Sequence, residues 1–259
     1  MRSNKPLIIV LCLSIIFSYI YGMMTVQYKF FPFRQLRSIK QFLNPDVNAK
    51  QIAKSSVNAK QIAKPSTNTN LSHSDYFYHK KSFFDHHGGH EYDVVFIGDS
   101  ITDGAEWKEL LPSLKIANRG IDGDRTDGIL NRMDSIYSTN ARKAFIMIGL
   151  NDFSNGAKVS NVAENYNSII SKLVAHGMHV YAQSTILAGK QKAKQNTKIK
   201  ALNEQLKKIA DANESVTYID LNIILAKHSF LNPDYSRDGF HLNGSGYAVW
   251  KELIENHLL

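Results

Sequence analysis

Four short polar blocks contain the residues whose types and spacing suit acyl-transfer chemistry. The first, Gly98-Asp99-Ser100, ends an apolar run with a sharp turn that projects a serine. A serine hydroxyl is a weak nucleophile at neutral pH, so it needs a neighbouring base and hydrogen-bond donors for the oxyanion that develops. Residues of both kinds occur further along the chain. The other blocks are Asn118-Arg119-Gly120-Ile121-Asp122-Gly123-Asp124, Gly149-Leu150-Asn151-Asp152 and Asp238-Gly239-Phe240-His241.

The last block places an acid and an imidazole three residues apart, at Asp238 and His241. An imidazole accepts a proton near neutral pH, and a carboxylate beside it stabilises the imidazolium that forms. Gly120 permits a tight backbone that directs an N–H toward an oxyanion, and Asn151 adds an amide donor. Each block alone also fits a turn or a helix cap, so the prediction of a site depends on all four together.

The chain between these blocks alternates short apolar runs with longer helical stretches, which predicts an α/β fold. Such alternation indicates a parallel sheet covered by helices on both faces, with functional residues at the C-terminal ends of the strands. The polar blocks follow the expected strands or lie in the terminal loop. We expect strands at 93–97, 114–117, 143–148, 179–184 and 216–219, and helices near 104–111, 126–137, 159–176, 194–213 and 244–258.

With the four blocks in this order, residues 90–258 resemble the SGNH, or GDSL-type, esterase and lipase family. The segments Asp103-Gly104-Ala105-Glu106-Trp107 and His241-Leu242-Asn243-Gly244-Ser245-Gly246-Tyr247 are most similar to a bacterial branch related to platelet-activating-factor acetylhydrolase and sialate O-acetylesterases. The resemblance implies a flavodoxin-like three-layer α/β/α domain with a parallel sheet of about five strands. It also implies catalysis without a metal or another cofactor.

The resemblance implies a role for each matching residue. Ser100 would be the nucleophile, His241 the general base and later the acid, and Asp238 the carboxylate that orients the imidazole. The oxyanion hole would comprise the backbone N–H groups of Ser100 and Gly120 and the side-chain amide of Asn151.

Other polar residues near the blocks receive structural interpretations. We interpret Asp99 and Asp103 as braces of the loop, and Arg119 and Arg125 as solvated surface residues. For the two arginines, contact with an anionic substrate at the rim of the site is the alternative. The histidines at positions 79, 86, 87 and 90 lack an accompanying pattern of cysteines or carboxylates, so we expect no metal site there.

The positive charge of the chain is confined to its N-terminal part. The whole chain carries +8, but residues 1–64 hold 10 Lys and Arg against one Asp, whereas residues 65–259 hold 21 basic against 22 acidic residues. The C-terminal part is therefore nearly neutral, which argues against a nucleic-acid-binding domain. The single cysteine, Cys12, excludes an intrachain disulfide.

The N-terminal part begins with an uncharged run from Pro6 to Met24, which as a helix measures about 28 Å, enough to span a bilayer. We expect an uncleaved signal-anchor over 1–26 rather than a cleaved signal peptide. The bases that follow the run favour a cytoplasmic C-terminal domain by the positive-inside rule, whereas the short basic tail before it favours export. We expect an exported, membrane-anchored domain.

Between the anchor and the domain lies a basic stretch over 27–74, which contains a direct repeat of Val-Asn-Ala-Lys-Gln-Ile-Ala-Lys at 47–54 and 57–64. Two copies are too few for a repeat fold, so we expect a juxtamembrane segment and stalk ahead of a hydrolase domain over 75–259.

These observations predict a membrane-tethered serine esterase that removes short acyl groups, acetyl above all, from a carbohydrate or other envelope substrate. The expected partners are therefore an acylated small molecule or polysaccharide and the membrane. Three alternatives stay open: a lysophospholipase or thioesterase, an acyltransferase on the same scaffold, and an inactive binding or scaffold protein. The sequence does not determine the oligomeric state.

Overall fold

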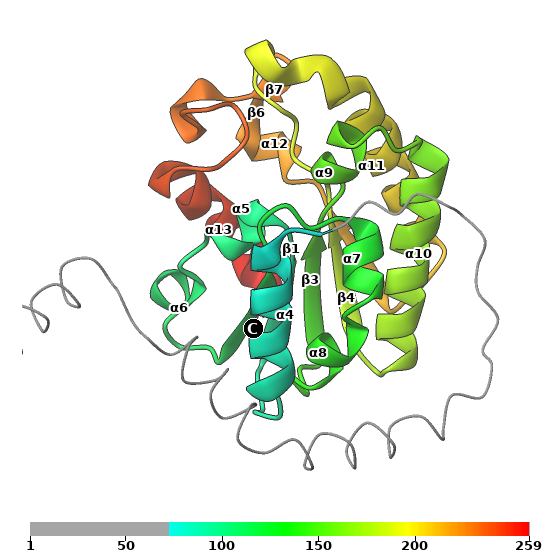
Figure 1. The fold of residues 1–259 in the computed structure, drawn as a ribbon. Helices are drawn as coiled ribbons and strands as arrows, with labels where there is room; N and C mark the ends of the chain where they lie inside the picture. Colours follow the sequence, from blue (N-terminus) through cyan, green and yellow to red (C-terminus); the bar gives the residue numbers. More distant parts are fainter. Residues whose placement is uncertain (1–72, 259) are drawn as a thin grey trace, which may run out of the picture. The chain divides into compact units, whose positions relative to one another are not determined.

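Five short apolar runs form the parallel strands of one sheet in the computed structural model, which describes residues 73–258. Their order, β2-β1-β3-β4-β5, is that of a flavodoxin-like fold, so the predicted sheet and its three layers are confirmed (Figure 1). Every pairing in this sheet is parallel. The strands are β1 (Val94–Gly98), β2 (Ile116–Gly120), β3 (Lys143–Met147), β4 (His179–Gln183) and β5 (Val216–Ile219).

Helices cover both faces of the sheet, and each face has its own apolar core. One face is covered by α7 (Thr126–Leu130), α8 (Met133–Tyr137), α10 (Val159–Ala175) and α11 (Asn196–Asp211). The other is covered by α5 (Ser100–Asp103), α6 (Trp107–Leu110), α12 (Asn222–Leu225) and α13 (Gly244–Leu258). The remaining elements are α4 (Asp75–His86), α9 (Leu150–Ser154), the 3-10 helices η1 (Lys190–Gln195) and η2 (Pro233–Tyr235), and the hairpin strands β6 (Ala226–Lys227) and β7 (Phe230–Leu231).

The strand register brings the polar blocks to one edge of the sheet. Gly98 at the end of β1 lies beside Gly120 in β2 and Met147 in β3. The segments that follow these three residues therefore emerge side by side at the C-terminal edge, where α5 and α9 lie in the upper half of Figure 1. The hydrophobic strands thus determine where Ser100 and Asn151 are placed.

The C-terminal helix α13 packs on the nucleophile side of the sheet. Its start is capped by Asn243, whose Oδ1 accepts a hydrogen bond from the N–H of Gly246 at 3.0 Å. Trp250 and Ile254 are buried, and the indole of Trp250 donates to Gln183 Oε1 at 2.7 Å. The Tyr247 hydroxyl donates to the carbonyl of Ile101 at 2.8 Å, which ties α13 to α5.

Several predicted boundaries are wrong, and the reasons are local. Of the expected helix at 104–111, only Trp107–Leu110 is helical, as α6, because a separate short helix, α5, begins at Ser100 and ends at Asp103 with Gly104 as its cap. The expected helix at 126–137 is divided into α7 and α8. Strand β2 extends to Gly120 rather than ending at residue 117, since its last residues pair with the end of β1.

Helix α4 was not predicted as a helix, although the expected domain boundary coincides with its start. Its first turn is capped by Ser74, whose Oγ accepts from the N–H of Phe77. The predicted signal-anchor over 1–26 and all but the last two residues of the predicted stalk over 27–74 lie outside the described residues. Between residues 73 and 258, no helix is both long and apolar enough to cross a bilayer.

Candidate active site

The serine turn begins where β1 ends. Ser100 is the first residue of α5, and Asp99 caps that helix by accepting the N–H of Ile101 at 3.1 Å. Asp99 is buried, and burial raises the pKa of its carboxyl to about 7 despite the hydrogen bond from Ile101. The interpretation of Asp99 as a brace of the loop agrees with this contact. The half-buried Ser100 side chain is thus presented from a rigid turn.

The structure brings the three residues of the predicted triad into one hydrogen-bonded chain. Ser100 Oγ lies 2.9 Å from His241 Nε2, although the two residues are 141 positions apart. On the other side of the ring, His241 Nδ1 lies 2.7 Å from Asp238 Oδ2. An ionised carboxylate only accepts hydrogen bonds, so the proton resides on Nδ1 and Nε2 is left to accept from the serine hydroxyl. This is the tautomer that activates a serine.

The loop around Asp238 keeps its carboxylate ionised. Partial burial alone would raise the pKa of Asp238, but three hydrogen bonds to the charged form outweigh it and hold the pKa well below its usual range. They come from the His241 side chain and from the backbone N–H groups of Phe240 and His241, the last two at 2.9 Å. The side chains of Asp238 and His241 are both 52% exposed, so solvent screens their ion pair.

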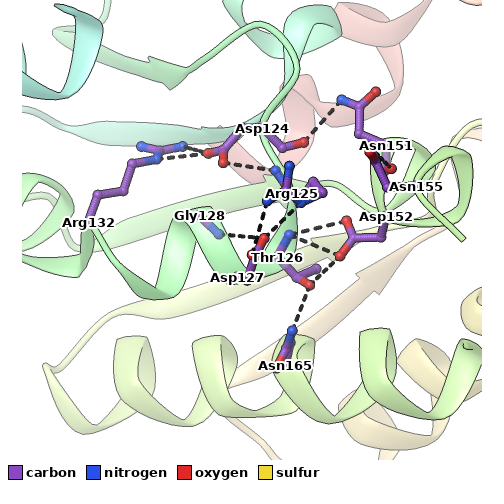
Figure 2. A network of polar contacts seen from close by, with 10 residues as sticks. All are labelled: Asp124, Arg125, Thr126, Asp127, Gly128, Arg132, Asn151, Asp152, Asn155 and Asn165. Carbon is purple, nitrogen blue, oxygen red and sulfur yellow. Dashed lines mark hydrogen bonds and ion pairs between the residues drawn. The ribbon is translucent and has the colours of Figure 1, made fainter. Parts of the chain in front are cut away.

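The amide of Asn151 lies at the same edge and is held by a neighbouring loop. Its Nδ2 donates to the main-chain carbonyl of Asp124 at 3.0 Å, a contact visible in Figure 2. An amide nitrogen has two hydrogens, so one remains for a ligand. Asn151 is therefore positioned to donate a hydrogen bond at the rim of the site.

A buried ion pair between Asp124 and Arg132 holds the Asp124 loop in place. Arg132 Nη2 lies 2.9 Å from Asp124 Oδ2, and both side chains are fully buried. The same guanidinium donates to the carbonyl of Arg119 at 2.8 Å. Burial raises the pKa of Asp124, and the charge of Arg132 opposes this. Figure 2 shows how this pair anchors the loop on which Asn151 rests.

A second buried carboxylate, Asp152, connects the same loop to helix α9. Its oxygens accept from the backbone N–H of Thr126 at 3.1 Å and from the Thr126 hydroxyl at 2.6 Å (Figure 2). Burial raises the pKa of Asp152 to about 6, although the hydrogen bonds from Thr126 lower it. The pairing fixes the residue next to Asn151, which explains why the third polar block contains an aspartate as well as an asparagine.

The structure treats the two glycines of the second block differently. The N–H of Gly120 already donates to Asn118 Oδ1 at 2.9 Å, so the predicted oxyanion donor is occupied. Gly123 has a φ of +74°, and within residues 73–258 its N–H has no hydrogen-bond acceptor. Gly123 precedes Asp124, whose carbonyl accepts from Asn151. In the sequence, Gly123 is marked only by its place in the same glycine-containing block as Gly120.

The interpretation of Arg119 and Arg125 as solvated surface residues is wrong. Their exposed fractions are 5% and 6%. The Arg119 guanidinium lies 4.6 Å from the centroid of the Phe84 ring, and its Nε donates to the carbonyl of Ser135. Arg125 pairs with Asp127 at 3.1 Å. Both side chains fold back onto the domain because aromatic rings, carbonyls and a carboxylate lie within reach there.

Asp103 braces the nucleophile helix, as interpreted, but through a helix that sequence reasoning missed. The Tyr76 hydroxyl donates to Asp103 Oδ2, and Lys80 Nζ lies beside Asp103 Oδ1, both at 2.7 Å. Both partners belong to α4. Burial, together with the hydrogen bond to Asp103, raises the pKa of Tyr76 to about 12.

A cavity of about 480 Å³ opens beside the imidazole of the triad. It is lined by Arg237, Asp238, His241, Leu242 and Asn243. Across residues 73–258, no group of three His, Cys, Asp or Glu side chains is arranged to hold a metal ion, and this includes the histidines at 79, 86, 87 and 90. The arrangement at this edge is suited to nucleophilic attack on an acyl carbonyl, with amide donors for the oxyanion.

Comparisons with known proteins point to one family. The sequence profile of the GDSL-like Lipase/Acylhydrolase family matches residues 96–249. One similar solved structure, from Streptococcus pneumonia, carries a name that refers to platelet activating factor. It is 25% identical with a TM-score of 0.66, and the match covers 71% of this chain and 93% of that one. An acetyl xylan esterase, AlAXEase, is 21% identical with a TM-score of 0.54, over 64% of this chain and 99% of that one, and shares the fold.

A curated relative is larger than the region it shares with this chain. It is an N-acylneuraminate cytidylyltransferase from Streptococcus agalactiae, 24% identical over 113 residues. The match covers 44% of this chain but 27% of that protein. The chain therefore spans about a quarter of the length of this relative.

Proposed function

The chain belongs to the GDSL-like lipase/acylhydrolase family, and on that premise we propose that it is a serine esterase that removes short acyl groups, acetyl above all, from a carbohydrate or other cell-envelope substrate. The observation that carries the proposal is the hydrogen-bonded chain from Ser100 through His241 to Asp238. Family membership makes the protein an acyl ester hydrolase. The three residues supply the groups that such a reaction requires.

In the proposed reaction, Ser100 Oγ attacks the carbonyl carbon of the ester while His241 Nε2 takes the hydroxyl proton. Asp238 stabilises the imidazolium through the 2.7 Å contact to Nδ1. The tetrahedral intermediate collapses, the alcohol leaves with the proton from His241, and an acyl-serine remains. Water then attacks the carbonyl carbon of the acyl-serine while His241 takes its proton. The second tetrahedral intermediate breaks its bond to Ser100 Oγ, His241 returns the proton to that oxygen, and the carboxylic acid is released.

The negative charge of the tetrahedral intermediate needs donors at the sheet edge. We assign this role to the backbone N–H of Ser100, the remaining hydrogen of the Asn151 amide and, in place of Gly120, the N–H of Gly123. The Gly120 N–H is engaged by Asn118, whereas that of Gly123 has no acceptor in residues 73–258. Removing one such donor typically costs about 10²- to 10³-fold in kcat.

The proposed substrate class draws on two further observations. A protein of the same fold is an acetyl xylan esterase, which by its name acts on an acetylated polysaccharide. The uncharged run over 6–24 supports placing the enzyme at a membrane, with its substrate in the cell envelope.

The test compares the full-length protein with a Ser100→Ala variant on p-nitrophenyl acetate. We expect a loss of at least 10³-fold in kcat/KM, because the variant cannot form the acyl-enzyme. A Ser160→Ala variant, which alters an exposed serine on α10, serves as the matched control. A fluorophosphonate probe should label the parent and Ser160→Ala proteins but not Ser100→Ala.

Equal rates for the parent and Ser100→Ala proteins would exclude the proposed nucleophile. A panel of acetyl and dodecanoyl esters then examines the acyl group. We expect the acetyl ester to be hydrolysed with the higher kcat/KM. Preference for the dodecanoyl ester would instead indicate a lipase or lysophospholipase.

A further inference from the structure

A second pocket lies on the other side of the loop that carries Asp238. It has a volume of about 550 Å³ and is formed by η1, the β6–β7 hairpin and the Asp238 loop. It shares Arg237 and Asp238 with the cavity beside His241. A ligand that fills both therefore extends from the triad to the hairpin, which lies above α5 in Figure 1.

The lining of this pocket is strongly basic. It includes His228 and four side chains that are charged at neutral pH, and Asp238 is its single acid. The Asp238 carboxylate is already engaged by His241. Within residues 73–258, none of the four cations forms an ion pair with a carboxylate. The four cations are Lys190, Lys192, Lys227 and Arg237.

This charge is local. Residues 65–259 as a whole hold 21 basic and 22 acidic residues, so a general excess of basic residues does not account for the four cations in this pocket. Like charges gathered in one pocket repel one another unless an anion neutralises them. The pocket is therefore suited to an anionic group.

The lining of the pocket also includes three apolar residues, Phe230, Leu231 and Pro233. A sugar ring presents C–H groups on its faces and hydroxyls at its edge, so it can pack against apolar side chains while its charged substituent meets the lysines. A small inorganic anion would use only the charged side chains. The combination favours an anionic saccharide.

The walls of the pocket are tied to the active-site loop. The N–H of Gly189 donates to the carbonyl of Gly239 at 2.8 Å, and the N–H of Leu231 donates to the carbonyl of Ala188 at 3.2 Å. Lys192 Nζ lies 5.7 Å from the centroid of the Phe240 ring. These contacts join η1, the hairpin and the loop of the triad, so the walls of the pocket are connected to the loop that carries Asp238 and His241.

The hairpin that carries Lys227 is closed by a two-residue turn. His228 and Ser229 have φ values of 52° and 67°, the left-handed conformation that both central residues of a type I′ hairpin turn adopt. The turn therefore holds the ends of β6 and β7, which line the pocket, close together.

We propose that this pocket binds the anionic group, a carboxylate or a phosphate, of an acylated saccharide, and so holds the ester beside Ser100. The inference rests on the proposed esterase function and adds the substrate class. In this arrangement the ester lies in the cavity next to His241, and the charged substituent lies between the η1 lysines and the hairpin. The pocket then selects among esters of equal chemical reactivity by charge.

The first experiment measures kcat/KM of the full-length protein for three acetylated sugars: methyl glucuronoside, glucose 6-phosphate and the neutral methyl glucoside. We expect at least one anionic ester to exceed the neutral ester about tenfold at low salt, and the preference to shrink at 0.5 M salt, where the Debye length falls to a few ångströms. The better of the two anionic esters identifies the charged group.

The second experiment reverses the charge of the pocket. A Lys190→Glu/Lys227→Glu variant should reduce the anionic-to-neutral ratio of kcat/KM about tenfold or more. A Lys172→Glu/Lys208→Glu variant makes the same change in net charge on α10 and α11, outside both pockets, and should keep the parent ratio.

A binding measurement separates failure of the pocket from failure of the esterase. Saturation-transfer NMR on the Ser100→Ala protein should detect trigalacturonate in preference to cellotriose, and the Lys190→Glu/Lys227→Glu changes should abolish that preference. Hydrolysis of all three acetylated sugars with equal kcat/KM, together with no preference for trigalacturonate, would refute the proposed anion-binding role of the pocket but not the esterase function. Charge-dependent binding without hydrolysis of any ester would support the pocket and overturn the esterase.

Discussion

The buried pair of Asp124 and Arg132 allows the most direct test of how the active-site edge is supported. We consider Asp124→Asn, which keeps the shape and the Oδ1 acceptor for the N–H of Arg125 but removes the charge. Arg132 would then be a fully buried cation without its carboxylate. Its Nη1 atom already has no hydrogen-bond partner among the described residues, so the guanidinium depends on Asp124.

The expected cost follows from this burial. Removing one partner of a buried ion pair typically destabilises a protein by about 3–5 kcal/mol, because the remaining charge stays desolvated. In the double variant Asp124→Asn/Arg132→Met, no buried charge is left without a partner. The main loss is the hydrogen bond from Arg132 to the Arg119 carbonyl, which should lower the free energy of unfolding by about 1–2 kcal/mol. The double variant should therefore be more stable than Asp124→Asn alone.

The assay is urea unfolding followed by tryptophan emission. The chain has two tryptophans, Trp107 and Trp250, which are 3% and 0% exposed and pack edge to face in the domain. Emission therefore reports unfolding of the domain itself. As a control, Asp85→Asn removes the exposed partner of Lys81 and should cost less than about 1 kcal/mol.

Two results would refute this reasoning. One is a loss of less than about 1 kcal/mol in the free energy of unfolding of Asp124→Asn, which would mean that Arg132 is solvated or paired elsewhere. The other is a double variant less stable than Asp124→Asn, which would mean that the buried charge is not the source of the cost.

Two further predictions concern the glycines and the pH dependence. Gly120→Ala should lower the free energy of unfolding in urea by about 3 kcal/mol or more, because the added Cβ would overlap the backbone of Asp103. Gly123→Ala should lower it by about 1 kcal/mol, because the added Cβ has open space and only the positive φ is unfavourable. Equal losses for the two variants would contradict this packing. The pKa of Asp99 is raised to about 7 from 3.8, so its contribution to stability is fully present below about pH 3.8 and is lost as the pH rises through 7, by up to about 4 kcal/mol. Asp99→Asn should therefore lose less stability than the parent between pH 5 and pH 8, and parallel losses in urea unfolding would contradict the assignment.

Much of the fold was predictable because the strands are short, apolar and bounded by polar turns. The expected strand at 216–219 is confirmed without change, and the other four expected strands overlap observed ones. Helix α4 escaped prediction because its aromatic and basic residues lack a clear apolar face, and it is recognisable only through its contacts with Asp103 and Arg119.

The arrangement of the site was less predictable, because sequence patterns carry no distances. The four polar blocks indicated Ser100, His241 and Asp238 together, but they did not distinguish Gly120 from Gly123. That distinction depends on which N–H group is already bonded, and Asn118 is the residue that occupies the one on Gly120. Likewise, the burial of Arg119 and Arg125 was not predictable. The partners of Arg119, Phe84 and Ser135, are distant in sequence, and no local pattern shows that Arg125 folds back onto Asp127.

The amino-acid sequence by itself determined the alternation of strands and helices, the order of the polar blocks and the residue types available for acyl transfer, because these follow from hydrophobic periodicity and local turn chemistry. The tertiary structure alone decided that Ser100 and His241, 141 positions apart, lie 2.9 Å from each other. It also decided that four cations gather in one pocket beside Asp238. Both depend on the packing of segments distant in sequence against one sheet, which no local pattern encodes.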